Sequence, residues 1–427
     1  MEIKRHRLSV IDSFQGILCV LVMTAAVLPL PLDAQMTTTR GLGMGGAYTA
    51  LARGVHAADW NPANLGLPDN PDFSMTIVSA SAYIGNNSFS YGTIYDYEGK
   101  YLTEQDIVDI MNKIPDSGFG GHVQASVRVL SFSVGQFAMT IGVTGGSSIT
   151  LDKDVFDLAF NGNDIDTQYR LHDINGMGMG IGFAGFSYGR QIPVSFTEVF
   201  ALGGTLHLTY GIGYAKTDMA QMTFNTQYDG YDLDGSYEVT SALGGLGWGV
   251  DIGAAVQIEK RWTVGMSLVN IIGSVPWDKE VKKETGYIRG NQITFQDMNL
   301  DDDVLEDSSY TVDAARFSTR APTELRLGAA YQEGPYIVTG DYIQGFDDGG
   351  WVSKKPLFSF GTEWQGLAWL PLRMGVMLGG RPGFATTYGL GLRPGHFVLD
   401  FAILNQGFVS AKGSKGLLYS IDMGLFF

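Results

Sequence analysis

The sequence predicts an all-β fold, a transmembrane outer-membrane β-barrel of about 14 antiparallel strands with an N-terminal plug segment. Long segments alternate apolar residues with small or polar ones. Glycine is abundant, with 58 residues, whereas charged residues make up only 17% of the chain. Beyond residue 34 no apolar run approaches the length of about 18 residues that a membrane helix needs. A closed barrel is the other structure that satisfies every backbone group in a membrane.

The clearest alternation covers residues 200–214, where large apolar side chains at even positions face small or polar ones at odd positions. This run exceeds the typical globular strand of about 5–6 residues and suits a tilted membrane strand of about 9–11 residues. Residues 248–258 and 262–268 repeat the pattern on either side of Lys260-Arg261. They therefore predict a hairpin at the short-turn end of a barrel.

The C-terminal strand shows the same period and ends on Phe427. One face carries the large apolar residues Leu417, Tyr419, Ile421, Met423, Leu425 and Phe427. This strand resembles the terminal recognition strand of bacterial outer-membrane barrels. The resemblance implies the barrel assembly machinery as a partner, recognised through the strand that ends at Phe427, and outer-membrane lipid around the barrel.

The first residues predict export. Lys4, Arg5 and Arg7 precede the apolar run 17–30, and Leu32-Asp33-Ala34 is a tolerable cleavage site, so residues 1–34 are interpreted as a secretory signal peptide. An uncleaved anchor is the rival interpretation, although the apolar run is short for a bilayer span. The single cysteine lies in this segment, so the mature chain would have no disulfide. The expected location is the bacterial outer membrane.

Charge and motifs argue against several functions. The formal net charge of −16 supplies no basic groove for nucleic acid. Residues 41–46 match a dinucleotide-binding glycine pattern without a preceding strand, and residues 185–189 match a hydrolase pattern inside a predicted strand. The six histidines have no metal-ligand spacing. We therefore expect no catalytic residues, no metal site and no cofactor, with an outer-membrane hydrolase as a weak third hypothesis.

The domain prediction places the plug, or hatch, at residues 35–72 and the barrel at 73–427. Long polar loops are expected at about 151–175, 216–243 and 274–316. Their acidic clusters are interpreted as solvated loop residues rather than as calcium ligands. A set of aromatic residues is expected at the membrane–water interfaces: Tyr210, Tyr214, Trp248, Trp262, Trp277, Trp351, Trp364 and Trp369.

A short amphipathic helix is expected near residues 103–114. Thr103 and Asp106 form a start that is similar to a capping box, and Pro115 ends the helix. Its apolar face consists of Ile107, Ile110, Met111 and Ile114. Three positions for this face stay open: the barrel interior, the inside of a loop, or the lipid interface.

Two motifs after the signal peptide carry a family resemblance. They are RGLGMGGA at residues 40–47 and AADWNPANL at residues 57–65. Together they resemble the N-terminal signature of the outer-membrane transporters of long-chain fatty acids and aromatic hydrocarbons, although Asn64 stands where that family usually has glycine. Residues 97–103 and the hairpin 249–270 resemble a related family of uncharacterised envelope proteins. The type IX secretion shuttle barrel is a further relative by the same signature.

The resemblance implies a barrel of fourteen strands whose lumen is plugged by the N-terminal segment. Its candidate ligand or hatch residues are Gly43, Gly46, Asn61, Pro62 and Ala63. A glycine-rich run followed by Asn-Pro also suits tight turns in a narrow lumen. The competing interpretation is that these five residues shape the plug and contact no ligand.

The expected function is a passive carrier or channel for hydrophobic small molecules of the fatty-acid or hydrocarbon type. The alternative is an envelope barrel that does not transport, and that acts as a secretion-associated or structural interaction partner through its acidic loops. A soluble β-sandwich is the main alternative to the fold, but sandwich strands are shorter and their polar faces carry more charge.

Overall fold

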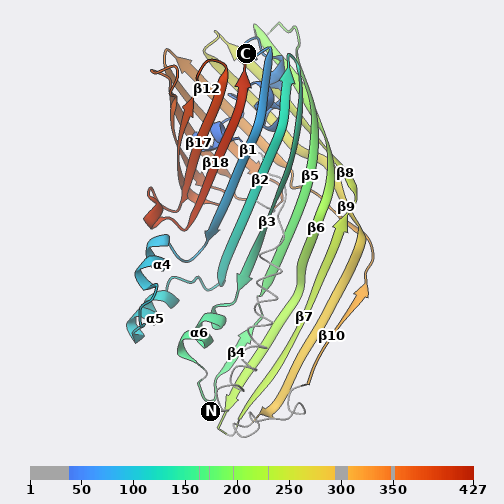
Figure 1. The fold of residues 1–427 in the computed structure, drawn as a ribbon, viewed down its shortest axis with the longest axis vertical. Coiled ribbons are helices and arrows are strands. Elements are labelled where there is room, and N and C mark those ends of the chain that lie inside the picture. Colours follow the sequence, from blue (N-terminus) through green and yellow to red (C-terminus); the bar gives the residue numbers. More distant parts are fainter. Residues whose placement is uncertain are drawn as a thin grey trace.

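The computed structural model describes residues 38–162, 164–172, 174–195, 197–228, 230–293, 306–347 and 352–427. The expected signal peptide, the acidic residues 301–303 and Trp351 lie outside these ranges. Within them the chain forms a closed antiparallel barrel of 14 strands, seen in the upper part of Figure 1. The predicted fold class is confirmed.

The barrel closes because β1 pairs with both β2 and β18. Each strand is antiparallel to its two neighbours. In order around the barrel the strands are β1 (Phe73–Asn86), β2 (Phe119–Val134), β3 (Phe137–Leu151), β5 (Asn175–Gln191), β6 (Val199–Gln227), β8 (Leu246–Ile258), β9 (Trp262–Ile293), β12 (Glu324–Glu333), β13 (Tyr336–Gly345), β14 (Leu357–Trp364), β15 (Leu372–Gly379), β16 (Gly383–Leu392), β17 (Phe397–Gln406) and β18 (Gly416–Phe426).

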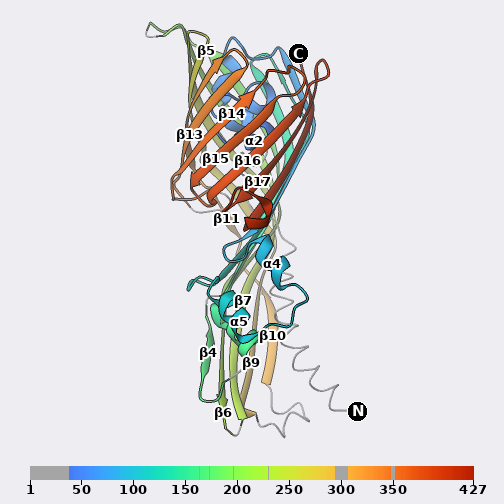
Figure 2. The ribbon, with the colours of Figure 1, turned by 90° about the vertical axis from the view of Figure 1, so that its left-hand side faces the viewer.

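On one side the sheet continues beyond the barrel as a tall extension (Figures 1 and 2). The ends of β6 and β9 are joined there by β7 (Gly230–Gly244), which pairs with both. The shorter strands β4 (Gln168–Leu171), β10 (Glu306–Asp313) and β11 (Phe317–Thr319) pair along the same two long strands. We call this part the extension.

The extension differs from the expected polar loops. Residues 216–243 are almost entirely strand, and much of 274–316 is strand as well. Polar composition indicates water on both faces of a segment. It does not prevent strand formation, because pairing satisfies the backbone donors and acceptors whether or not a face is apolar.

Short helices cover the same end of the barrel. α4 (Tyr91–Tyr97), α5 (Glu104–Met111), α6 (Lys153–Asn161) and η5 (Ala411–Gly413) lie in the connections between strands. α5 starts with a reciprocal capping box between Thr103 and Asp106. Ile110 on its apolar face is buried, and α5 packs against α6. Of the three positions left open, the helix face therefore lies inside the loop region. No helix in the described ranges is both long and apolar enough to cross a membrane.

Alternation of side chains separates the two faces of the wall. On β6, Leu206 and Leu208 are exposed on the outer face, whereas Thr205 and Thr209 are buried inside. β18 repeats this pattern, with Tyr419 and Ile421 exposed and Ser420 and Asp422 buried. An apolar outer surface around a polar interior is the arrangement of a barrel in lipid.

A bulge interrupts the alternation of β2. The β2–β3 register shifts between Arg128 and Phe132, and Leu130 adopts a positive φ of 47°. The extra residue moves the inward positions from even to odd numbers, so that Arg128 and Ser131 are both buried.

Among the aromatic residues expected at the interfaces, Trp364 is partly buried, and the other described ones form two groups. Tyr210, Trp248, Trp262 and Trp369 are exposed on the outside of the barrel. Tyr214 and Trp277 are instead buried in an apolar cluster at the base of the extension. The prediction was wrong for this pair because β6 and β9 extend beyond the barrel, where an inward aromatic ring packs against its neighbours.

Candidate functional site

The N-terminal segment (residues 38–72) lies inside the barrel, where it contacts the inner wall; Figure 2 shows its first helix enclosed by β14 to β17. Most of its residues are buried. It consists of four short helical pieces: α2 (Thr39–Gly43), η2 (Gly54–His56), α3 (Ala57–Trp60) and η3 (Pro62–Gly66). The lumen therefore contains a compact irregular chain in addition to the inward side chains of the wall.

Glycines of the wall make room for this segment. A Cβ atom added to Gly375 on β15 would lie 2.6 Å from Cα of Gly45, and one added to Gly328 on β12 would lie 2.9 Å from Cβ of Thr49. Real Cβ atoms do not approach other atoms this closely, so the segment would have to move. The glycines in close contact with the segment come from eight strands of the wall: Gly189, Gly203, Gly253, Gly265, Gly328, Gly361, Gly375 and Gly389.

The five candidate residues from the sequence all lie in this packed region. The carbonyl of Gly43 accepts a hydrogen bond from Thr387 Oγ1 at 3.2 Å. Gly46 has a φ of 72° in a turn against Met377. Asn61 caps η3 by accepting from Ala63 N at 3.1 Å and donates Nδ2 to the carbonyl of Ala254 at 3.0 Å.

Pro62 packs against the wall glycines, and Ala63 is fully buried. None of the five candidates lines the cavity described below. Their contacts are those of residues that fit the segment to the wall. Whether they also contact a passing ligand stays a prediction.

A chain of alternating charges anchors the start of the segment. Arg40 donates Nε and Nη2 to the two carboxylate oxygens of Glu363 on β14, both at 2.8 Å. Glu363 also accepts from Arg373 on β15 at 2.5 Å. Arg373 donates in turn to Asp400 on β17 at 2.6 Å, and Asp400 accepts from Arg393 at 2.8 Å. Bidentate arginine–carboxylate pairs fix orientation as well as distance, so this network holds α2 in one position.

A second carboxylate binds the backbone of the segment directly. Asp341 on β13 accepts hydrogen bonds from the N–H groups of Tyr48 and Thr49 through Oδ2, at 3.0 and 2.9 Å. Both donors belong to a turn that has no strand partner of its own. Buried backbone donors need such acceptors, and the wall supplies one in the form of a charged side chain.

A third group lies at α3. Asp59 accepts a buried hydrogen bond and ion pair from Arg128 of β2, beside the bulge. Arg326 of β12 donates to the carbonyl of Asp59 at 2.9 Å. The guanidinium of Arg326 also lies 5.1 Å from the ring centre of Trp60, within the range of a cation–π contact. Burial raises the pKa of Asp59, and the charge of Arg128 opposes part of that rise.

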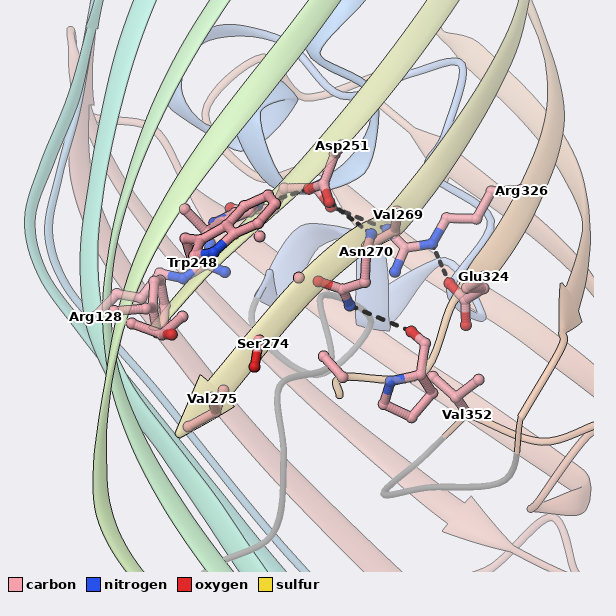
Figure 3. Close-up of a pocket in the computed structure, with 18 residues that line it drawn as sticks. Arg128, Trp248, Asp251, Val269, Asn270, Ser274, Val275, Glu324, Arg326 and Val352 are labelled. Carbon is pink, nitrogen blue, oxygen red and sulfur yellow. Dashed lines mark hydrogen bonds and ion pairs between the residues drawn. The ribbon is translucent and has the colours of Figure 1, made fainter. Parts of the chain in front are cut away.

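A small cavity lies between this group and the base of the extension (Figure 3). Its volume is about 50 Å³, whereas a cavity of roughly 150 Å³ is known to hold benzene. Around it, His207 Nε2 lies 2.7 Å from Asp251 Oδ2, and Asp251 accepts from Asn270 N at 2.7 Å. Phe183, Val275 and Val352 supply apolar lining. In this conformation the cavity has room for water molecules but not for an aromatic hydrocarbon.

Some hydrogen-bonding capacity around the cavity is unused. Arg128 Nε, His207 Nδ1 and Thr209 Oγ1 are buried without a partner in the structure. Buried polar atoms are normally satisfied by protein or by ordered water. Water molecules in the cavity would satisfy these atoms.

Sequence reasoning missed the charged residues of the interior. Arg128 and Arg373 each stand at an inward position between two apolar outward neighbours, and Glu363 stands between Thr362 and Trp364. A lone charge at a small or polar position of an alternating strand is therefore the signal that could have found them. The hydrolase-like Ser187 does not form an active-site elbow, because it lies within β5 and its Oγ is 2.8 Å from Thr205 Oγ1.

The closed antiparallel barrel with an enclosed N-terminal segment defines the class of protein, a 14-strand β-barrel with an occupied lumen. The P. putida toluene transporter TodX has a TM-score of 0.51 at 11% identity, over 92% of this chain and 99% of the transporter. The monoaromatic hydrocarbon channel CymD also has a TM-score of 0.51 at 12% identity, over 93% of this chain and 99% of the channel. These similarities show the fold and confirm the resemblance inferred from the sequence.

The chain belongs to a family of unknown function (DUF5723), whose model matches residues 62–242 and 229–399. This match is consistent with the predicted relation to a family of uncharacterised envelope proteins. No curated protein matches the chain.

Proposed function

We propose that the protein is an outer-membrane channel or carrier for small hydrophobic molecules, and that the N-terminal segment is its gate. The observation that carries this proposal is the fit of a separate, irregular chain segment into a lumen lined with glycine. A barrel that served only as a scaffold could fill its interior with its own side chains. The proteins TodX and CymD, described as a toluene transporter and a hydrocarbon channel, support the substrate class by their shared fold.

The geometry suggests a path with three steps. A hydrophobic molecule first meets the partly buried apolar side chains at the base of the extension, among them Met177, Ala314 and Phe317. It then reaches the cavity beside Asp59. Because the cavity is too small for an aromatic ring, passage requires the whole N-terminal segment, from α2 to η3, to move away from the wall. The molecule is released laterally or at the short-turn end.

A reversible lock tests the gate. Thr39 Oγ1 and Ser420 Oγ lie 2.6 Å apart, so cysteines at both positions would form a disulfide between the segment and β18. The single natural cysteine, Cys19, is replaced by serine. The matched control places cysteines at Gln221 and Ser236, which pair across β6 and β7 in the extension and do not tie down the segment.

The assay measures uptake of labelled toluene and of a fluorescent fatty acid. It uses intact cells whose own hydrophobic-compound channels are deleted, because a bare phospholipid bilayer lets such molecules through. We expect uptake with the reduced Thr39→Cys/Ser420→Cys variant and its loss after oxidation, with no redox effect in the control. Uptake equal to that of cells without the protein would reject the channel, and equal uptake in both redox states would reject the gate.

A second candidate function is an interaction barrel. It is favoured by β10, whose residues Glu306–Asp313 are all exposed and pair only with β9 among the described strands. An exposed edge strand is a template for pairing with another chain. Gentle extraction followed by mass spectrometry tests this function: a reproducible protein partner supports it, and recovery of the barrel alone counts against it.

A further inference from the structure

An exposed apolar patch lies outside the barrel, at the rim between the wall and the extension. It consists of Ile94 and Tyr95 on α4 and of Phe408 and Val409 in the β17–β18 connection. The exposed fractions of these side chains are 51%, 75%, 50% and 51%. We call this set the rim patch. In Figures 1 and 2, α4 lies beside the barrel just past the ends of the short strands.

The rim patch is held rigidly against the wall. The backbone N–H of Tyr91 donates to the carbonyl of Ser414 at 3.0 Å, which ties the start of α4 to the β17–β18 connection. Gly92 faces Lys412 so closely that an added Cβ would lie 2.8 Å from the Lys412 carbonyl oxygen. The two halves of the patch therefore form one unit.

The same unit is continuous with the lipid-facing surface. Tyr388 on β16 donates its hydroxyl to the carbonyl of Val409 at 3.2 Å, and Tyr388 is itself exposed on the outer wall. Tyr388 and Tyr419 belong to one row across the sheet, since both pair with Ile403. Burial and the nearby Tyr419 raise the pKa of Tyr91, as expected for a ring that lies close to this row.

The composition of the patch matches a membrane interface. Tyrosine and lysine are favoured at the level of the lipid headgroups, where a ring or a methylene chain meets apolar surface and the polar end meets water. Lys412 is exposed beside α4, and Lys100 Nζ lies 5.7 Å from the centre of the Tyr97 ring. An apolar patch that faced only water would be costly.

We propose that the rim patch is embedded in the headgroup region of the lipid leaflet around the barrel, so that α4 fixes the depth of the barrel in the membrane. This inference rests on the membrane location in the proposed function, but not on transport. The occupant of the patch is a lipid surface, and a protein partner is the outcome that the test must distinguish.

Site-directed spin labelling tests the inference. Single cysteines replace Tyr95, Val409, Leu206 and Tyr228 in a chain that carries Cys19→Ser, and the labelled proteins are reconstituted in phosphatidylethanolamine–phosphatidylglycerol vesicles. Leu206 reports the outer wall, and Tyr228, which is 81% exposed at the tip of the extension, reports water. The measurement is the ratio of collision rates with oxygen, which concentrates in lipid, and with a water-soluble nickel chelate.

We expect this ratio at Tyr95→Cys and Val409→Cys to be several-fold higher than at Tyr228→Cys and lower than at Leu206→Cys. A ratio at Tyr95→Cys equal to that at Tyr228→Cys, with Leu206→Cys in lipid, would overturn the inference alone. Protection of Tyr95→Cys from both reagents would indicate a protein partner and would also overturn it. A water-like ratio at Leu206→Cys would instead reject the membrane location itself.

Discussion

Arg40 and Glu363 meet in a bidentate ion pair, although 323 positions separate them in the sequence. The glutamate side chain is almost fully buried, whereas the arginine side chain is 23% exposed. Glu363 keeps Arg373 as a second partner, so the loss of Arg40 would not leave it an isolated buried charge. The pair therefore specifies the position of α2 without being needed for closure of the barrel.

Arg40→Gln should loosen the start of the N-terminal segment. Loss of hydrogen bonds to a charged group is expected to cost about 1.5–3 kcal/mol. Hydrogen–deuterium exchange of residues 38–50 should accelerate, while exchange of the wall strands stays unchanged. Arg40→Lys keeps the charge but not the two parallel bonds, and it should fall between the wild type and Arg40→Gln. Wild-type exchange in Arg40→Gln would contradict this account.

Asp59→Asn should be far more damaging than Asp69→Asn. The first change leaves Arg128 buried without a carboxylate, which is expected to cost about 3–5 kcal/mol. Asp69 pairs with Arg53 but its side chain is 50% exposed, and such surface pairs contribute about 1 kcal/mol or less. Uptake of the hydrophobic probe and exchange at α3 should both rise in Asp59→Asn alone. Identical behaviour of the two variants would show that the Asp59–Arg128 pair does not hold the gate.

In Gly375→Ala, the one added methyl group should push the segment away from the wall. The added Cβ has no free space beside Gly45, and overpacking of this kind costs about 1–3 kcal/mol. Gly182→Ala is the matched control, because its Cβ would meet one carbonyl oxygen at 4.0 Å. The temperature at which the folded form disappears on a denaturing gel should fall for Gly375→Ala and not for the control. Equal temperatures would refute the tight fit of segment and wall.

Acid should weaken the docking of the N-terminal segment in the barrel, through protonation of His56. The ring is 5% exposed, and burial lowers the pKa of His56 from 6.5 to about 3. Its Nε2 lies 4.0 Å from Asp422, too far for a hydrogen bond that would favour the proton. In a detached segment His56 therefore binds a proton below about pH 6.5, whereas in the docked segment it binds one only near pH 3. Docking is therefore strongest above pH 6.5 and weakens as the pH falls.

The measurement for His56 is limited proteolysis of residues 38–72 across this pH window. Wild-type cleavage should increase as the pH falls, and His56→Gln should show a smaller increase. His172→Gln, at an exposed position of the loop region, is the control and should behave as the wild type. A steep acid response that persists in His56→Gln would assign the effect to other groups.

The barrel was predictable because its signal is local. Alternation such as that of residues 200–214 is visible within one strand and gives both the strand and its outer face. The extension was not predicted because the ends of β6 and β9 carry polar residues on both faces, and composition alone does not distinguish a wet strand from a loop. The helix at α5 was found through its capping residues, which are also local.

The interior was much less predictable. The motifs at residues 40–47 and 57–65 pointed to the segment that fills the lumen, but the partners of Arg40, Tyr48 and Asp59 lie on distant strands. Their pairing depends on which strand closes beside which, and one sequence does not contain that information. The glycines of the wall also give no sign in the sequence that the segment occupies the space beside them.

The ring of wall glycines has a consequence for assembly. Eight strands of the cylinder present a glycine to the lumen, and the segment fills the space beside these glycines. The segment also binds both sides of the seam, since Val55 donates to Ser74 on β1 and Thr39 is hydrogen-bonded to Ser420 on β18. We therefore expect closure of the barrel and burial of the N-terminal segment to be a single cooperative event. The segment, which is synthesised early, would then dock only when β18, which is synthesised last, pairs with β1.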